Sequence, residues 1–450
     1  MRSYRESNGL NRLLSRVAIA FAIGDSVSVT RDLLSPKTLF AWRISAGHGF
    51  VQGGEHAGWH VRAFHSAGAT YITGTGERRM TLRLSTALLL RPRDVQPSQC
   101  GWEVVGVLNP AVVAVGDELF MIARVAERPA ERRPGWTALP RWTASGGTAV
   151  DWIRDGDLLP SDARVVTTKI NGNLRLTSIS HFQLLRQSVV DGDWETVGVL
   201  RPEGPWEEYG VEDPRITRID GMYWITYVAV SRSGAATALM SSRDLVTYER
   251  HGIIFPSENK DVVLFPDRIA GEYVALHRPT PKSHFHPPQI WIARSPDLVH
   301  WGRHAPILGG WHPWEADRVG SGTPPVLIDE GYLMLYHGSA VSQIAGTVGA
   351  YAAGACLLDR EDPSHVIARS REPIMLPTTD FEKSGFVPNV VFPTAQLDLG
   401  EHIGVFYGAA DTCIAMTLLS KRSILDSLEQ AGTQSDAVFR KGEPSGGSGI

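Results

Sequence analysis

Short hydrophobic runs, separated by turn residues, dominate the chain from Met80 onward. The runs are rich in β-branched and aromatic residues, have the length of strands, and mostly follow a glycine turn such as Asp220-Gly or Glu330-Gly. They include Ala111–Val115, Leu119–Ala123, Tyr223–Val230, Tyr273–His277, Tyr332–Tyr336 and Ile403–Tyr407. Because no helical period separates them, the pattern predicts an all-β protein.

A weak internal repeat narrows this prediction. Ser242-Arg-Asp-Leu-Val-Thr-Tyr and Ser295-Pro-Asp-Leu-Val-His-Trp share a pattern, with a degenerate third copy in Val190-Asp-Gly-Asp-Trp. At roughly 55–70 residues per blade, the ~370 residues after Met80 predict a β-propeller of five or six blades. A β-helix would have a shorter period, and an α/β barrel would need eight helical segments that the pattern lacks.

The pattern of short hydrophobic runs also predicts the domain boundaries. Residues 1–79 have no sustained apolar period, and three interpretations stay open: a small module, a disordered extension, or an upstream start codon with Met80 as the natural start. Residues 80–430 form the predicted catalytic propeller, and residues 431–450 a flexible polar tail. The Arg-, Pro- and Trp-rich segment from Glu127 to Asp162 is either a lid at a binding site or a surface excursion without a role.

Composition and charge exclude several classes of function. The 450 residues carry 44 Lys and Arg against 48 Asp and Glu, a net charge of −4, which argues against nucleic acid or anionic membranes as partners. Cys100, Cys356 and Cys413 are too far apart for a disulfide framework or a Cys-x-x-Cys metal site. The longest apolar run near the start, Val17–Ile23, falls short of the ~20 residues that span a bilayer. We therefore expect a soluble, cytoplasmic protein without a metal.

The densest polar motif is Glu208-Tyr-Gly-Val-Glu-Asp-Pro-Arg-Ile-Thr. It places Glu212 and Asp213 after a glycine turn, at the entrance to a predicted strand. Pro214 disfavours the helical region for the residue before it, so we expect Asp213 to be extended and its carboxylate to point in a fixed direction. A fixed acid suits general acid catalysis, although a surface ion pair with Arg215 also explains the motif taken alone.

Polar residues recur at the ends of other predicted strands. Lys260, Arg278, Arg318 and His337 are four potential cations at corresponding strand ends. In a propeller such ends converge on one mouth of the channel, and convergent cations favour an anionic ligand, most simply phosphate. Taken one at a time, each residue is equally explained by an ordinary turn.

Four groups of motifs follow one another between about Leu82 and Leu425. They are Gly210-Val-Glu-Asp-Pro-Arg-Ile, Lys260-Asp-Val-Val-Leu-Phe-Pro with His277-Arg-Pro, Gly320-Ser-Gly-Thr-Pro-Pro with Tyr336-His-Gly, and Val387-Pro-Asn-Val-Val-Phe-Pro-Thr with Tyr407-Gly-Ala-Ala-Asp. Together they resemble glycoside hydrolase family 130, the β-mannoside phosphorylases and related mannosidases. The resemblance implies a five-bladed β-propeller with the sugar bound at the mouth of its channel.

The resemblance also implies the roles of single residues. Asp213 is the catalytic acid, which protonates the glycosidic oxygen through a sugar hydroxyl while inorganic phosphate attacks the anomeric carbon from the opposite face. The implied phosphate ligands are Lys260, Arg278, Arg318 and His337. The implied substrate ligands are Asn109, Arg124, Glu212, Asp261, Tyr351 and Asp411, with Tyr209 and Trp314 as further candidates for stacking on the sugar.

The expected activity is inverting phosphorolysis of β-1,2- or β-1,4-linked mannosides, or of mannosyl-glucose or mannosyl-GlcNAc, giving α-mannose 1-phosphate. Inorganic phosphate is the co-substrate, and no cofactor is expected. The alternative is a phosphate-independent β-mannosidase of the same family, with Glu212, Asp267 or Glu315 as the base. A non-catalytic carbohydrate-binding propeller is the third interpretation. The linkage, the acceptor sugar and a homo-oligomeric assembly stay open.

Overall fold

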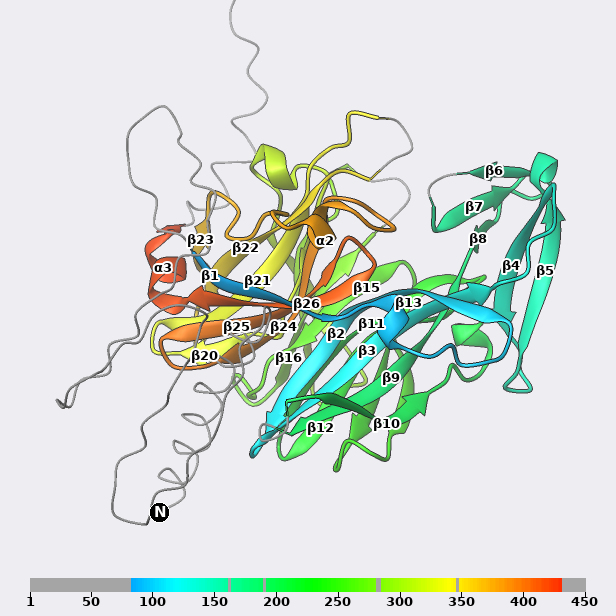
Figure 1. The fold of residues 1–450 in the computed structure, drawn as a ribbon. Coiled ribbons are helices and arrows are strands. Elements are labelled where there is room, and N and C mark those ends of the chain that lie inside the picture. The colour runs from blue at the N-terminus through cyan, green and yellow to red at the C-terminus, as the bar shows by residue number, and fades with distance from the viewer. Residues whose placement is uncertain (1–81, 161–162, 189–191, 281–284, 345–347, 431–450) are drawn as a thin grey trace, which may run out of the picture.

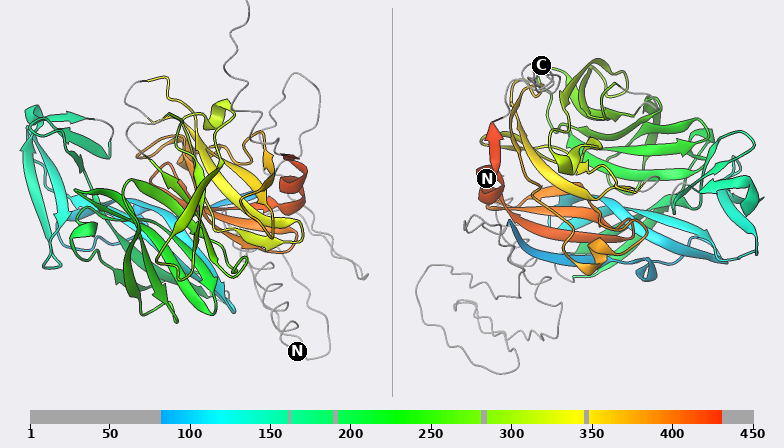
Figure 2. Two further views of the ribbon diagram at one scale, coloured as in Figure 1. Left: turned by 180° about the vertical axis from the view of Figure 1, so that it is seen from behind. Right: turned by 90° about the horizontal axis from the view of Figure 1, so that it is seen from above.

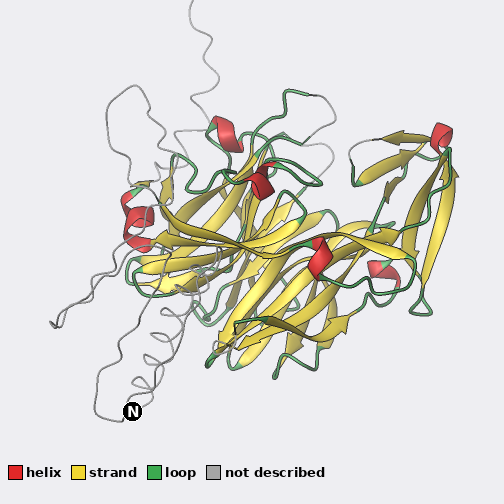
Figure 3. Ribbon diagram, viewed as in Figure 1, coloured by secondary structure: helices red, strands yellow, loops and turns green. Residues whose placement is uncertain are grey.

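The computed structural model describes residues 82–160, 163–188, 192–280, 285–344 and 348–430, which form an all-β protein (Figure 1 and Figure 3). The prediction of an all-β fold is thereby confirmed. The predicted segments 1–79 and 431–450 lie outside the described residues. In the described part, no helix is long and apolar enough to cross a bilayer.

Most strands of the described chain belong to five antiparallel meanders, which we number along the sequence. The first contains β2 (Trp102–Val115), β3 (Glu118–Pro129), β9 (Ile179–Ser188) and β10 (Trp194–Leu200). The second contains β11 (Gly210–Ile219), β12 (Met222–Ser231), β13 (Gly234–Ser242) and β14 (Glu249–Phe255). The third contains β15 (Asn259–Leu264), β16 (Tyr273–Pro279), β17 (Ile290–Ser295) and β18 (Gly302–Leu308).

The last two meanders include strands from both ends of the described chain. The fourth contains β19 (Arg318–Ser321), β21 (Gly331–Ser339), β22 (Tyr351–Leu358) and β23 (Val366–Ser370), flanked by β20 (Val326–Ile328) and β27 (Leu428–Gln430). The fifth contains β24 (Val391–Asp398), β25 (His402–Ala409), β26 (Cys413–Ser420) and β1 (Arg83–Leu90). Strand β1 pairs antiparallel with β26, so the first described strand completes the sheet of the last meander.

An excursion separates β3 from β9 within the first meander and projects from the rest of the molecule (Figure 1). It contains the hairpin β4 (Trp136–Trp142) and β5 (Thr148–Arg154) and the sheet β6 (Leu158–Pro160), β7 (Val165–Thr168) and β8 (Leu174–Leu176). The helical segments are short: η1 (Pro92–Asp94), η2 (Asp155–Asp157), η3 (Pro205–Glu207), η4 (Pro313–Glu315), α2 (Asp380–Lys383) and α3 (Lys421–Asp426).

Buried hydrophobic clusters lie between successive meanders, and the fifth meander packs against the first (Figure 2). Their members include Ala111, Phe182 and Ile225 between the first and second, Leu239, Val262 and Ala275 between the second and third, Val263, Leu276 and Met334 between the third and fourth, Leu335 and Val405 between the fourth and fifth, and Phe406, Val107 and Met121 between the fifth and first. Each meander thus buries apolar side chains on both faces. The five-bladed closure itself stays a prediction.

The internal repeat seen in the sequence corresponds to one recurring turn. The two copies join β13 to β14 and β17 to β18, the third and fourth strands of two successive meanders. The hydroxyl oxygens of Ser242 and Ser295 accept backbone N–H bonds of 2.8 and 2.9 Å from the leucine three residues later. Asp244 and Asp297 accept backbone bonds in the same way. The degenerate copy at residue 190 falls on residues outside the described ones.

A buried triad of Glu, Arg and Tyr recurs in three meanders. In each, the glutamate belongs to a short helical turn before the first strand, the tyrosine to the second strand and the arginine to the fourth. The triads are Glu207, Tyr227 and Arg250; Glu315, Tyr336 and Arg369; and Glu382, Tyr407 and Arg83. Each triad fixes the chain where it enters the first strand of its meander.

Candidate active site

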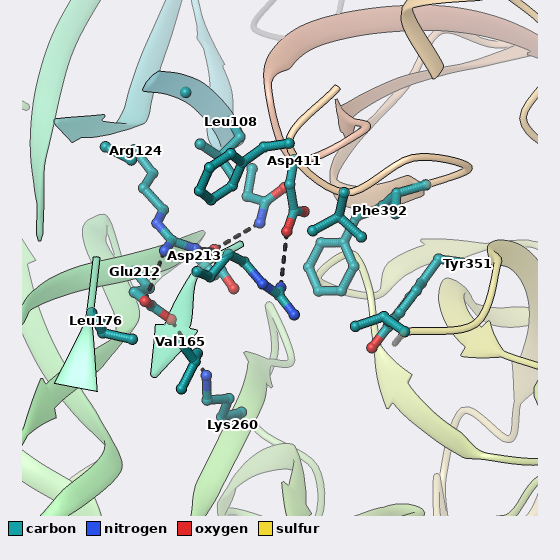
Figure 4. A pocket seen from close by; sticks show the side chains of 18 of the residues that line it. Leu108, Arg124, Val165, Leu176, Glu212, Asp213, Lys260, Tyr351, Phe392 and Asp411 are labelled. Carbon is teal, nitrogen blue, oxygen red and sulfur yellow. Dashed lines mark hydrogen bonds and ion pairs between the residues drawn. The ribbon is translucent and has the colours of Figure 1, made fainter. Parts of the chain in front are cut away.

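The first strands of the meanders border a cavity of about 340 Å³ (Figure 4). Its lining includes Asn109 of β2, Arg124 of β3, Glu212 and Asp213 of β11, Lys260 and Asp261 of β15, Arg278 of β16, Arg318 of β19, Tyr351 of β22, and Asp411 from the turn between β25 and β26. The lining thus includes every predicted catalytic, phosphate-binding and substrate-binding residue except His337 and the two further stacking candidates, Tyr209 and Trp314. The fold therefore brings together residues that are far apart in the sequence.

Three first strands carry the same local distortion where they meet the cavity. Asn109, Asp213 and Asp261 have positive φ angles of 48°, 50° and 56°. Each lies at a β-bulge, where the pairing with the second strand shifts register. Asn and Asp tolerate this left-handed conformation better than other non-glycine residues, and bulges redirect side chains beside active sites. The bulge is therefore what aims these three polar groups.

The prediction of an extended Asp213 is wrong. Its φ of 50° lies in the left-handed region, and it sits inside β11 rather than at a strand entrance. The steric preference imposed by Pro214 gives way because two residues of β11 lie opposite one residue of β12 between the pairs of Glu212 and Arg215. The carboxylate still has a fixed direction, but the bulge supplies it.

Asp213 is held by two donors. Its Oδ1 accepts a hydrogen bond of 2.7 Å from Asn109 Nδ2 and one of 2.9 Å from Arg124 Nη1. Burial alone would raise the pKa of Asp213. The charges of Arg124, Arg215 and Lys260 and the Asn109 bond outweigh burial, and hold that pKa below its usual value. The acid is therefore ionised in the empty site.

Glu212 links the two sides of the cavity. Its Oε1 accepts a 2.7 Å bond from Arg124 Nη2, and its Oε2 lies 3.3 Å from Lys260 Nζ. Arg124 therefore bridges Glu212 and Asp213 with two different nitrogens (Figure 4). Both carboxylate oxygens of Glu212 are therefore engaged by cations.

Asp261 anchors the cationic side. Its Oδ2 accepts a 2.6 Å bond from Arg278 Nε. Burial would raise the pKa of Asp261, but Arg278, His337 and Arg215 hold it far below its usual value. Arg318 extends the group of cations and is itself paired with Asp317, at 2.7 Å between Nε and Oδ2.

His337 lies behind this group rather than in the cavity wall. Its imidazole is fully buried, with Nε2 3.3 Å from Asp261 Oδ2 and its ring 4.3 Å from that of Phe392. Burial lowers the pKa of His337, although the Asp261 charge opposes this. His337 is not part of the cavity lining, and its direct contact with phosphate stays a prediction. In its observed position, His337 supports Asp261.

Asp411 closes the opposite side. Its Oδ2 lies 2.9 Å from Arg164 Nη1, which comes from the excursion immediately before β7. Burial raises the pKa of Asp411, Arg164 and Arg124 oppose that rise, and Asp213 adds to it. The sequence did not reveal Arg164, since its link to Asp411 spans 247 positions.

Arg215 is a second residue whose role the motif alone did not show. It is 2% exposed, donates from Nη1 to the Asp213 carbonyl at 2.8 Å and from Nε to the Gly322 carbonyl at 2.6 Å. Burial lowers its pKa against the charges of Asp213 and Asp261. The guanidinium of Arg215 is thus buried and bonded to backbone carbonyls, so the alternative of a surface ion pair does not hold.

Several candidate residues lie away from the cavity lining. Glu315 is buried against Arg369, and Asp267 accepts a bond from the Tyr332 hydroxyl, so neither base candidate faces the cavity. Tyr209 and Trp314 do not line it either. The hairpin β4–β5 is also absent from the lining, whereas Arg164, Val165 and Leu176, further along the excursion, belong to it.

Comparisons with known proteins agree on one family. The glycoside hydrolase 130 family model, described as beta-1,4-mannooligosaccharide phosphorylase, matches residues 161–430. A beta-1,2-mannobiose phosphorylase of Listeria innocua is 37% identical over 351 residues, which cover 76% of this chain and 96% of that protein. A 1,2-beta-oligomannan phosphorylase of a Thermoanaerobacter species is 40% identical over 230 residues, or 50% of this chain and 73% of the relative.

A solved structure extends the similarity to three dimensions. The beta-1,2-mannobiose phosphorylase from Listeria innocua, in complex with beta-1,2-mannobiose, matches with a TM-score of 0.71 at 36% sequence identity. The match covers 75% of this chain and 96% of that chain.

Proposed function

The chain belongs to glycoside hydrolase family 130 and catalyses the phosphorolysis of β-mannosides; from this premise we propose that it acts on β-1,2-linked mannobiose or short β-1,2-oligomannans. The linkage is supported by the relative whose length this chain covers almost completely, a beta-1,2-mannobiose phosphorylase. The family model bears a β-1,4 description but matches a shorter segment. The substrates are the oligosaccharide and inorganic phosphate, and we expect no cofactor and a cytoplasmic location.

One observation carries the mechanism: Asp213, the candidate acid, lines the same cavity as Lys260, Arg278 and Arg318, the candidate phosphate ligands. An inverting hydrolase needs a second carboxylate to activate water. Phosphate is already a nucleophile, so the enzyme has only to hold it, orient it and protonate the leaving oxygen. Asp213 is the acid, and Lys260, Arg278 and Arg318 hold the phosphate. Attack from the face opposite the leaving group gives α-mannose 1-phosphate.

The remaining polar groups bind the sugar. Asn109 and Arg124 donate to Asp213 and fix its carboxylate, while Glu212 and Asp411 offer acceptors to sugar hydroxyls from either side. Tyr351 supplies an aromatic wall beside Phe392, with ring centroids 6.1 Å apart. Sugar hydroxyls need such convergent polar groups, and an apolar sugar face needs the ring.

We also propose that the five meanders are the blades of a closed propeller. The packing of the fifth meander on the first, and the pairing of β1 with β26, support this closure. A phosphate-independent mannosidase is less consistent with the cavity, because hydrolysis by water does not need Lys260, Arg278 and Arg318 in the lining. Glu212, a candidate base, is also held by Arg124 and Lys260.

The test is to incubate the purified protein with β-1,2- or β-1,4-mannobiose, with and without inorganic phosphate, and to quantify mannose 1-phosphate and mannose. We expect phosphate-dependent formation of mannose 1-phosphate, faster from the β-1,2 isomer. Release of mannose at an equal rate without phosphate would reject the phosphorylase. Faster turnover of the β-1,4 isomer would reject the linkage alone.

A further inference from the structure

Asp261 is a carboxylate among the groups that hold the phosphate. It follows Lys260 in β15, accepts a bond from Arg278 of β16 and interacts electrostatically with Arg215 of β11 and Arg318 of β19. It is 5% exposed, and that remaining surface lines the cavity. An anion at the centre of an anion-binding site needs an explanation.

The two oxygens of Asp261 have different surroundings. Oδ2 accepts the 2.6 Å bond from Arg278 Nε and lies 3.3 Å from His337 Nε2. Oδ1 accepts no hydrogen bond from the described residues. Among those residues, the polar side-chain atoms that are fully buried without a partner do not include Oδ1, so it keeps some exposed surface. It is therefore the acceptor that remains accessible from the cavity. The bulge at Asp261, with φ of 56°, fixes this orientation.

A phosphate held by Lys260, Arg278 and Arg318 would place its charge beside Oδ1. Two anions in contact in a buried site repel each other unless a proton lies between them. Asp261 does not supply that proton, because the surrounding cations hold its pKa far below the usual value. The imidazole of His337 contacts Oδ2, on the other side of the carboxylate. The proton must come from the phosphate.

We propose that Asp261 accepts a hydrogen bond from the phosphate's own hydroxyl, and thereby makes the site select hydrogen phosphate over oxyanions that carry no proton, such as sulfate. This inference rests on the proposed function and assigns Asp261 to the nucleophile rather than to the sugar. Arg278 and His337 position the carboxylate through Oδ2, and Oδ1 discriminates between anions.

The reaction balances with this proton in place. An ionised phosphate oxygen forms the new bond to the anomeric carbon, the glycosidic C–O bond breaks, and the leaving oxygen takes the proton of Asp213. The phosphate hydroxyl facing Asp261 is retained, so the first product is the mannose 1-phosphate monoanion. Phosphate monoesters lose their second proton near pH 6, so that proton is lost on release while Asp213 is reprotonated.

The wild-type enzyme provides the first test. Sulfate and monofluorophosphate resemble hydrogen phosphate in size but carry no acidic proton at neutral pH, and each is tested as a competitor of phosphate. Because a hydrogen bond to a charged group is lost and repulsion takes its place, we expect inhibition constants at least about tenfold above the KM of phosphate. Either anion competing as well as phosphate would overturn the proposal.

The second test compares two variants. In Asp261→Asn the amide no longer repels sulfate, so the ratio of sulfate inhibition constant to phosphate KM should fall by about tenfold. The control is Asp317→Asn, which also removes a carboxylate beside a cavity cation, Arg318, but one outside the cavity lining. It should affect both anions alike and leave the ratio unchanged. An unchanged ratio in Asp261→Asn contradicts the proposal.

Failure of this inference is distinguishable from failure of the proposed function. If no mannose 1-phosphate forms with any mannobiose, the phosphorylase activity is wrong. If it forms but sulfate competes as well as phosphate, only the role of Asp261 is wrong. Should Asp261→Asn not fold, the competition series on the wild-type enzyme decides by itself.

Discussion

Replacing Asp213 by Asn keeps the size of the side chain and removes the proton that the leaving oxygen needs. General acid assistance contributes ~10²–10⁴-fold, so we expect kcat of Asp213→Asn to fall by about that factor. Initial rates of mannose 1-phosphate formation measure the loss, and circular dichroism checks the fold. Glu195→Gln, an equivalent change at an exposed position of β10, should leave kcat unchanged. A fully active Asp213→Asn enzyme would show that another group is the acid.

The charge around Asp213 also predicts a pH dependence. Arg124, Arg215 and Lys260 hold its pKa low in the empty site, yet it must be protonated to act. Bound phosphate offsets part of this positive charge, which raises the pKa of Asp213 and preserves the acid form to higher pH. The basic limb of kcat/KM for mannobiose should therefore move to higher pH at saturating phosphate than at low phosphate. Identical pH profiles at both concentrations would contradict this coupling.

Motifs predicted single residues well where chemistry requires one residue type. Asp213, Lys260, Arg278 and Arg318 were all expected to meet, and all line the cavity. Backbone conformation was not predictable in this way, because the left-handed φ of Asp213 depends on the register between β11 and β12. The burial of His337 behind Asp261 was not predictable either, because a motif gives the residue type but not its depth.

At the scale of elements, the triad of Glu382, Arg83 and Tyr407 couples stability to pH. Burial opposes ionisation of Glu382, but its bonds to Arg83, Thr379 and Tyr407 lower its pKa from 4.5 to about 2. A lowered pKa means that the stabilisation is present above the unfolded-state value near 4.3 and is lost as the pH falls toward about 2. The shift corresponds to about 3 kcal/mol of unfolding free energy at neutral pH.

Glu382→Gln should therefore be less stable than the wild type by about 3 kcal/mol at pH 7, with the difference shrinking below about pH 4. Urea unfolding at a series of pH values measures the stability difference at pH 7 and its decrease at lower pH. Glu401→Gln, which alters an exposed carboxylate beside β25, is the matched control and should follow the wild-type curve. A difference that stays constant down to pH 3 would show that the ion pair does not cause it.

Strands were predictable from short hydrophobic runs bounded by turn residues, since both are local features of the sequence. The triads were not, because each joins a turn, a second strand and a fourth strand that only the fold brings together. The short turns Pro205-Trp-Glu and Pro313-Trp-Glu are a sequence signal that would have revealed two of them.

At the scale of the whole molecule, the position of β1 predicts which truncations the enzyme tolerates. Every described strand begins at or after Arg83, and every cavity residue lies beyond it. A chain that starts at Met80 should therefore keep its kcat/KM and unfolding midpoint. A chain that starts at Pro92 lacks β1, leaves β26 as an unpaired edge and should unfold at a clearly lower temperature or aggregate. Equal stability of the two would mean that β1 is dispensable.

The all-β architecture was predictable from the short hydrophobic runs and their turns. The five or six blades expected from the repeat spacing stay a prediction. The excursion between β3 and β9 did not follow from this spacing, because an insertion breaks the period on which such a count depends. Its contribution of Arg164 to the cavity was hidden by the same insertion.

The pairing of β1 with β26 also determines when the site can form during synthesis. Ser85 and Thr417, which are hydrogen-bonded across this pair, are 332 positions apart. At about 5–20 residues per second, β1 emerges from the ribosome roughly 17–66 s before its partner. Asp411, in the turn just before β26, is translated equally late. The nascent chain therefore carries β1 as an unpaired strand until β26 has been translated, and the catalytic pocket cannot be completed before that point.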